Sequence, residues 1–178
     1  NPTSGGFNFS VSRAANAIAD FTLNDAPDAF GVVDIGACTN GRLFAIADPA
    51  VTPGSYKSPT GTGHIYFRNA NSSVWNELSN TPTSVATRID GGINGNAIFT
   101  DGNNIWLTDG STTASVSKNA NTNTLGSITD VAFDRINNNV VCTDQSGNIF
   151  WAKVNAANKT AIAGSWTMIS GNTTFSNI

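Results

Sequence analysis

The sequence predicts an all-β fold, a β-propeller built from three to four four-stranded blades. Composition is the first observation, because only 12% of the 178 residues are charged and Asn, Ser, Thr and Gly supply the polar character instead. Those residues favour turns and disfavour helix interiors. Second, the strand-forming residues Val, Ile, Thr, Phe and Trp occur in short clusters between the turn residues. The third observation is an internal repeat.

Three segments share one pattern, in which a turn residue and a polar residue precede Ile and then aromatic or apolar positions. They are residues 63–68 (GHIYFR), 103–108 (NNIWLT) and 147–152 (GNIFWA). Ile65 and Ile105 are 40 residues apart, and Ile105 and Ile149 are 44 residues apart. A period of about 40–45 residues with four short strands in each unit is typical of a propeller.

The other strands of each unit recur with the same motif. A strand that ends in Asp precedes each Ile-aromatic strand, at 43–48, 97–101 and 140–144. In the first unit the connecting turn is lengthened to 49–62, which holds three prolines and is expected to be a surface loop. Inner strands with small residues, suited to the crowded centre of a propeller, are expected at 32–37, 84–89 and 128–133. Outer strands are expected at 74–78, 114–118 and 166–170.

The units form one predicted domain, 1–178, with blades at 32–79, 84–118 and 128–170. Three blades leave two open edges, whereas a propeller ring normally has about four to eight blades. We therefore expect one of two forms of closure. Either residues 1–30 and 171–178 share a closing blade, made from 6–23 and 174–178, or a homo-oligomer completes the ring.

Charge and hydropathy limit the partners. The formal net charge is −3 and no Lys/Arg cluster exists, so nucleic acid is not an expected partner. No stretch of about 18 apolar residues occurs, so membrane insertion is not expected. The chain begins with Asn1, which fits either a mature form that has lost a leader or an excised fragment. Four Asn-x-Ser/Thr sequences permit a location outside the cell, or on a virion or cell surface.

No cofactor or metal site is predicted. His64 is the only histidine, so a histidine-based metal cluster or a Ser-His-Asp triad is excluded or incomplete. Cys38 and Cys142 do not form a CxxC motif. They lie in different blades, and we expect two buried free thiols rather than a disulfide.

Catalysis is not expected either. Asp48, Asp101 and Asp144 occupy equivalent hairpin positions, where a carboxylate commonly accepts the N–H groups of the turn. The five arginines show no cluster that could clamp a carboxylate substrate, as sialidase-type chemistry requires. The sequence therefore favours a binding protein over an enzyme.

The aromatic residues carry the functional hypothesis, since exposed Trp and Tyr rings stack on the C–H faces of sugars. The predicted ligand-binding residues are Tyr66, Arg68, Trp106, Asp109 and Trp151. Tyr66 and Trp106 are the expected stacking platforms, with Arg68 and Asp109 as polar contacts. Trp151 is one position out of phase with Trp106. The alternative is that the aromatic residues pack between blades.

Residues 75–106, 147–151 and 166–171 are similar to the repeats of tectonin-type propeller lectins. The same stretches resemble Asp-box propeller repeats, although the full Ser-x-Asp-x-Gly-x-Thr-Trp box occurs nowhere. The resemblance implies a non-catalytic, lectin-like propeller whose partner is a glycan or cell-surface ligand. The alternative function is a structural or adhesive component of a virion or surface appendage, such as a receptor-binding or decoration protein.

Overall fold

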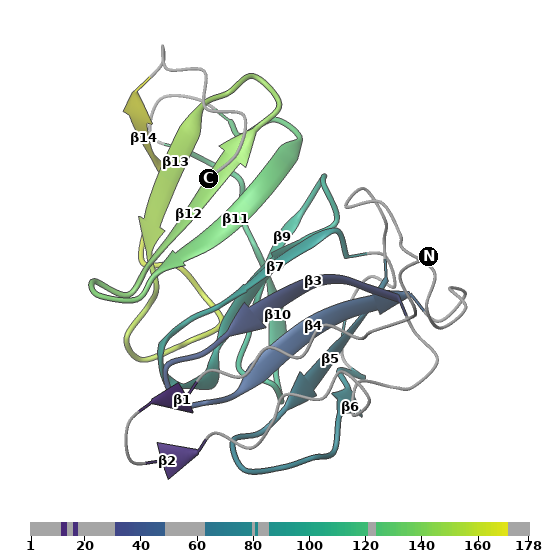
Figure 1. Ribbon diagram of the computed structural model, residues 1–178. Coiled ribbons are helices and arrows are strands. Elements are labelled where there is room, and N and C mark those ends of the chain that lie inside the picture. Colours follow the sequence, from purple (N-terminus) through teal and green to yellow (C-terminus); the bar gives the residue numbers. More distant parts are fainter. Residues whose placement is uncertain are drawn as a thin grey trace.

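The computed structural model describes residues 12–13, 16–17, 31–48, 63–79, 81, 86–120 and 124–170. Three four-stranded antiparallel sheets make up most of this part of the chain (Figure 1). Each sheet contains consecutive strands in sequence order, as in a propeller blade. The predicted all-β propeller fold is therefore confirmed.

The blades follow one another along the chain, and we number them accordingly. Blade 1 contains β3 (Gly31–Ala37), β4 (Leu43–Asp48), β5 (His64–Arg68) and β6 (Asn76–Glu77). Blade 2 contains β7 (Arg88–Gly91), β8 (Ala97–Thr100), β9 (Ile105–Thr108) and β10 (Thr113–Val116). Blade 3 contains β11 (Ile128–Asp134), β12 (Asn139–Asp144), β13 (Ile149–Lys153) and β14 (Thr167–Ser170).

Two details differ from the predicted strands. The inner strand of blade 2 is β7, later in the chain than the predicted 84–89, and Ala86 instead forms an isolated bridge with Gly63. The outer strands of blades 1 and 3 begin directly after Trp75 and Trp166 rather than containing them. A short 3₁₀ turn, η2 (Ile93–Gly95), connects β7 and β8.

The closing blade falls largely outside the described residues. Within 6–23, the structure describes β1 (Ser12–Arg13) and β2 (Asn16–Ala17), which pair with each other. Residues 174–178 are not among those described. Closure of the ring therefore stays a prediction.

Side chains from both faces of blade 2 fill two hydrophobic cores. Phe99 and Trp106 belong to the core shared with blade 1. Ile98 and Leu107 alternate with them and belong to the core shared with blade 3. All four side chains are buried. Blade 2 is thus a fully covered middle layer between two flanking blades.

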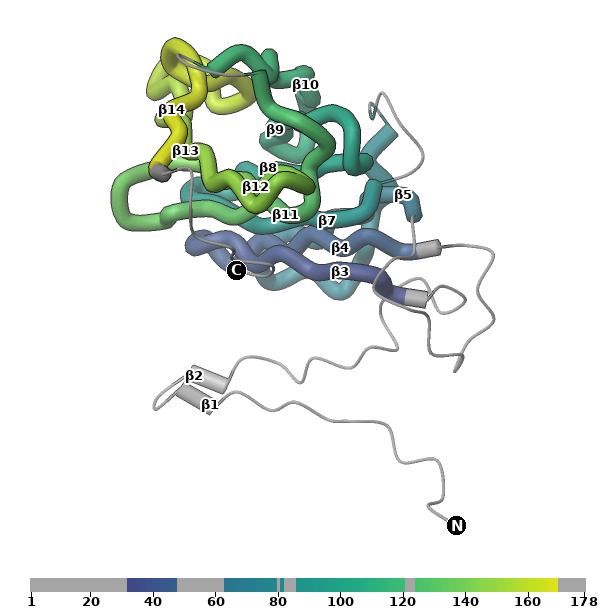
Figure 2. Tube along the Cα trace, turned by 90° about the horizontal axis from the view of Figure 1, so that it is seen from above, coloured from purple at the N-terminus to yellow at the C-terminus, as the bar shows by residue number. Residues whose placement is uncertain are grey.

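The inner strands β3, β7 and β11 lie side by side at the centre (Figure 2). Between β3 and β7 the backbones approach so closely that only glycine fits. A Cβ atom on Gly36 would lie 2.5 Å from the backbone nitrogen of Gly91, and a Cβ atom on Gly91 would lie 2.5 Å from the carbonyl carbon of Ala37. The predicted small residues at the propeller centre thus have a direct steric cause at these two positions.

The two cysteines are free and buried, as predicted. Cys38 donates a hydrogen bond from Sγ to the carbonyl oxygen of Asn96, at 3.2 Å. Burial raises the pKa of the Cys38 thiol to about 11, and burial beside Asp144 raises the pKa of Cys142 as well. Both thiols are therefore protonated at neutral pH and act as small apolar groups.

The contact between β3 and β7 gives a direct test of the packing. Gly36→Ala should lower the free energy of unfolding by about 1–3 kcal/mol, since the added methyl group must push two backbones apart. The matched control is Gly126→Ala, whose Cβ atom would have only ordinary contacts, the nearest at 3.5 Å to Asp144. Chemical denaturation measures both. Equal stability of the two variants would contradict the close approach.

Candidate functional site

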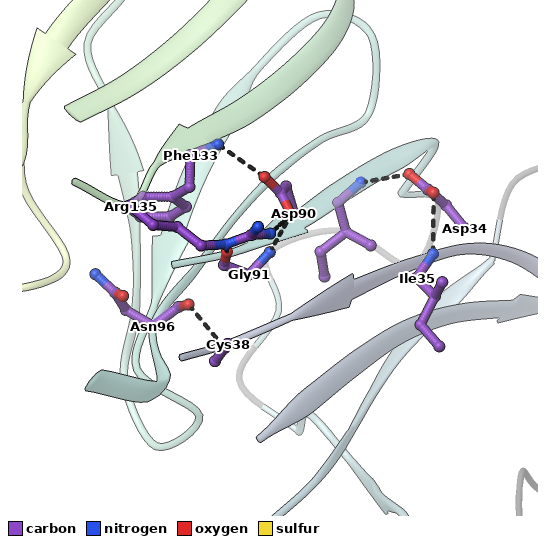
Figure 3. Close-up of polar contacts among 9 residues, drawn as sticks. Asp34, Ile35, Cys38, Asp90, Gly91, Asn96, Phe133 and Arg135 are labelled. Carbon is purple, nitrogen blue, oxygen red and sulfur yellow. Dashed lines mark hydrogen bonds and ion pairs between the residues drawn. The ribbon is translucent and has the colours of Figure 1, made fainter. Parts of the chain in front are cut away.

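Two aspartates on the inner strands join each blade to the next (Figure 3). In blade 1, Asp34 accepts a hydrogen bond on Oδ2 from the backbone N–H of Ile89 in blade 2, at 2.8 Å. In blade 2, Asp90 accepts one on Oδ2 from the backbone N–H of Phe133 in blade 3, also at 2.8 Å. We call this pair of contacts the aspartate seam.

The second oxygen of each carboxylate accepts a hydrogen bond from the backbone of its own strand. Oδ1 of Asp34 accepts the N–H of Ile35 at 2.9 Å, and Oδ1 of Asp90 accepts the N–H of Gly91 at 2.8 Å. In β3 the pairing register shifts between Val32 and Asp34. Such a bulge redirects side chains out of the regular alternation. Here the bulged strand carries the carboxylate that bonds the neighbouring blade.

Burial has the largest electrostatic effect on the carboxyl group of Asp34. It raises the pKa of Asp34, although the N–H groups of Ile89 and Ile35 and the charge of Arg88 act in the opposite direction. Each of the two oxygens of Asp34 accepts one backbone N–H group, from its own strand on one side and from blade 2 on the other. The geometry therefore assigns Asp34 to holding the blades together.

Two arginines reinforce the same junctions. Arg135 of blade 3 donates from Nη2 to Asp90 Oδ1 at 2.7 Å and from Nε to the Gly91 carbonyl at 2.8 Å. Arg42 of blade 1 donates from Nη1 to two carbonyl oxygens of blade 2, those of Gly95, at 2.9 Å, and of Asp109. Both guanidinium groups donate to backbone or carboxylate groups of an adjacent blade, which gives them a structural role at the junctions.

A different group of polar and aromatic residues lies on the outer half of blade 1. We call it the outer patch, and it consists of His64, Tyr66, Arg68, Trp75 and Glu77. His64, Tyr66 and Arg68 alternate with the core residues of β5 and therefore share the face turned away from blade 2. Glu77 is the cross-strand partner of Tyr66 on β6.

Contacts within the outer patch hold its charged groups in place. His64 Nδ1 and Glu77 Oε1 are 2.6 Å apart, with 37% and 53% of the two side chains exposed. The guanidinium carbon of Arg68 lies 5.6 Å from the centre of the half-buried Trp75 ring, within the range of a cation–π contact. An exposed carboxylate, an imidazole and a guanidinium thus lie on β5 and β6, with an indole directly before β6. Such groups can bond hydroxyls and contact an apolar ring face.

The structure corrects the two predicted stacking platforms. Trp106 is only 5% exposed and stacks on Phe99 with a ring-centre distance of 5.3 Å, in the core between blades 1 and 2. Tyr66 is 7% exposed, and burial together with Glu77 raises its pKa. Neither ring presents the open face that stacking on a sugar requires.

The other predicted residues lie apart from one another. Arg68 belongs to the outer patch beside Tyr66, whereas Trp151 is half-buried on blade 3. Asp109 lies in the turn between β9 and β10, where its Oδ1 accepts the backbone N–H groups of Ser111 and Thr112 at 2.9 and 2.7 Å. Burial alone would raise the pKa of Asp109, but these hydrogen bonds hold it below the usual value. Only Tyr66 and Arg68 are brought together.

Sequence reasoning left three members of the outer patch out of the site. His64 was considered only as a metal ligand or a member of a triad, and Trp75 and Glu77 were assigned only to an outer strand. The alternation of side chains along β5 could have identified His64, because it places His64 on the same face as Tyr66 and Arg68. The pairing of β5 with β6, which brings Glu77 alongside, depends on a turn that the sequence pattern does not define.

The hairpin aspartates have the predicted structural role where they are described. Asp101 Oδ1 accepts the N–H groups of Asn103 and Asn104, at 2.8 and 2.7 Å. Asp144 Oδ1 accepts those of Ser146 and Asn148, at 2.9 and 3.0 Å. A search of the described residues finds no group of three or more His, Cys, Asp or Glu side chains placed to hold a metal ion. In the same part of the chain, no helix has the length and apolar character needed to span a membrane.

No protein-family model and no curated protein matches the sequence. Solved structures do match, and they are β-propeller proteins. A structure described as YCF48 bound to D1 peptide has a TM-score of 0.52 and 10% identity, covering 77% of this chain and 39% of that chain. A GH74 enzyme of Niastella koreensis has a TM-score of 0.52 and 14% identity, covering 79% and 24%. A nidogen/laminin complex has a TM-score of 0.48 and 12% identity, covering 76% and 48%.

The two similarities with TM-scores of 0.52 show the fold, a β-propeller-like repeat, and do not single out tectonin-type or Asp-box repeats. The chain spans less than half the length of each of these three proteins.

Substitution of Asp90 tests the aspartate seam, and substitution of Asp109 is the control. Asp90→Asn should lower the free energy of unfolding by roughly 1–3 kcal/mol, because an amide has one acceptor oxygen and Asp90 uses two. Asp109→Asn should cost less, since Asp109 accepts the hydrogen bonds of Ser111 and Thr112 on Oδ1, and an amide retains one acceptor oxygen. Urea unfolding of both variants measures the difference. A neutral Asp90→Asn would show that the seam does not join the blades.

Proposed function

We propose that this chain is a non-catalytic, lectin-like propeller that binds a glycan through the outer patch of blade 1, outside the cell or on a virion or cell surface. The observation that carries the proposal is the exposed His64–Glu77 pair next to the Trp75 ring and the Arg68 guanidinium. Carbohydrate sites combine an aromatic surface with a few fixed polar groups. The outer patch has both, on β5, on β6 and at the residue directly before β6.

Each group of the outer patch has a distinct role in this proposal. The Trp75 ring supplies an apolar surface for the C–H face of a sugar, and the Arg68 contact fixes the orientation of that ring. Glu77 accepts hydrogen bonds from sugar hydroxyls, while His64 holds the carboxylate in position at 2.6 Å. Tyr66 packs beneath them as a buried support.

The number and pairing of the carboxylates in the described residues support binding without catalysis. A glycoside hydrolase generally needs two carboxyl groups on opposite sides of the scissile bond. The outer patch contributes one, Glu77, and it is paired with His64. Asp34 and Asp90 are committed to backbone N–H groups of neighbouring blades. The GH74 enzyme shares only 14% of aligned residues, so its activity is not transferred to this chain.

The second candidate is a structural or adhesive role with a protein partner. The observation that favours it is the exposure of large apolar side chains, Ile35 at 45% and Ile169 at 56%. Exposed apolar surface is typical of protein–protein contacts. Binding of glycans by the purified chain separates the two candidates.

Glycan-array binding followed by substitution tests the proposal. Trp75→Ala should weaken binding roughly tenfold, since a stacking aromatic contributes about 1 kcal/mol beyond its buried area. Glu77→Gln should also weaken binding, by removing a charged acceptor. Trp151→Ala is the control, because it removes a half-buried tryptophan from blade 3 and should leave affinity unchanged.

Two results would contradict this assignment. If wild-type protein binds no glycan, the lectin-like function is wrong. If it binds and Trp151→Ala rather than Trp75→Ala reduces affinity, the site lies on blade 3. Circular dichroism of each variant separates a loss of binding from a loss of folding.

A further inference from the structure

Glu77 is the charged group of the outer patch that is most open to solvent. Its side chain is 53% exposed, against 37% for His64, and Arg68 is half-buried. An ionised carboxylate accepts hydrogen bonds and donates none, and it offers about four lone-pair sites. The contact between His64 Nδ1 and Glu77 Oε1 does not exhaust them. A ligand that approaches the outer patch therefore meets a hydrogen-bond acceptor that carries a negative charge.

The two nitrogen-bearing groups of the outer patch that could attract an anion are each held by a neighbour. His64 Nδ1 lies 2.6 Å from Oε1 of Glu77. The guanidinium carbon of Arg68 lies 5.6 Å from the centre of the Trp75 ring, whose face attracts a cation. An anionic ligand would have to compete with Glu77 for His64 and with Trp75 for Arg68. The outer patch is thus better arranged for hydroxyl groups than for an anion.

The apolar part of the outer patch continues into the turn before β6. Val74 directly precedes Trp75 and is 60% exposed. Ser72 holds this turn, because its Oγ accepts the N–H of Val74 at 3.1 Å and its own N–H donates to the carbonyl oxygen of Asn69 at 3.1 Å. Arg42 in turn donates from Nε to Oδ1 of Asn69 at 2.9 Å. Val74 and Trp75 are therefore ordered before a ligand arrives, which lowers the entropic cost of binding.

We propose that the outer patch selects uncharged sugars over anionic ones, an inference that rests on the proposed glycan-binding function. Glu77 accepts hydrogen bonds from adjacent hydroxyl groups of one sugar, while the C–H face of that sugar contacts Trp75 and Val74. Hydroxyl groups supply the donors that a carboxylate needs. An ionised carboxylate or sulfate on the ligand has only acceptors, so Glu77 repels it. The net charge of −3 acts in the same direction.

A glycan array that carries each oligosaccharide in two forms, neutral and with a terminal sialic acid, tests the proposal on the whole chain. The neutral form should bind more tightly by roughly fivefold, the effect of two like charges about 4 Å apart in water. Raising sodium chloride from about 0.05 M to about 0.5 M should leave binding of the neutral form unchanged, because salt screens only interactions between charges.

Three substitutions separate the effect of charge from that of apolar contact. Glu77→Gln keeps the shape of the side chain, and it should weaken binding of the neutral form and remove the difference between the two forms. Val74→Ser should weaken both forms to the same degree, because it removes apolar surface and no charge. Ile136→Ser is the matched control, since Ile136 is 91% exposed in the turn between β11 and β12 of blade 3 and its loss should change neither form.

The possible failures can be told apart. If the sialylated form binds more tightly and salt weakens that binding, glycan binding stands but the selection of uncharged sugars is wrong. A Glu77→Gln chain that keeps the full preference for the neutral form would show that Glu77 is not the selecting group, which also overturns the inference. If no glycan of either form binds to the wild-type chain, the proposed function fails and this inference fails with it.

Discussion

The carboxylates of Asp34 and Asp90 are the constraint on which the rest of the structure depends. Each bonds the backbone of its own strand with one oxygen and the inner strand of the next blade with the other. The blades can therefore meet at only one register. Because the donors are backbone N–H groups, the contact does not depend on which side chains the next blade carries. It can therefore recur from blade to blade.

This register explains the other features at the centre and in the cores. It brings β3 so close to β7 that Gly36 and Gly91 cannot carry a Cβ atom. It also sets which side chains of blade 2 face which neighbour, so that Phe99 packs toward blade 1 and Ile98 toward blade 3. The outer strands lie far from this constraint, and there the paired side chains of His64 and Glu77 are partly exposed to solvent.

Much of the fold could be predicted from the sequence, because its signals are local. The repeat of 40 and 44 residues and the hairpin aspartates define the strands with little dependence on distant contacts.

The prediction that Trp106 is an exposed stacking platform was wrong for a physical reason. A strand covered on both faces, such as β9, is buried at every position, so alternation no longer shows which ring is exposed. The aspartate seam was missed because it depends on bulges and on contacts between blades, which no sequence period reveals.

Amide hydrogen exchange at Ile89 and Phe133 tests the seam most directly. Each of these N–H groups donates a hydrogen bond to a carboxylate of the preceding blade. If the seam holds the blades together, nuclear magnetic resonance should show these two amides as protected as the central amides of β8 and β12. Exchange at the rate of exposed turn amides, such as that of Ile136, would contradict the account.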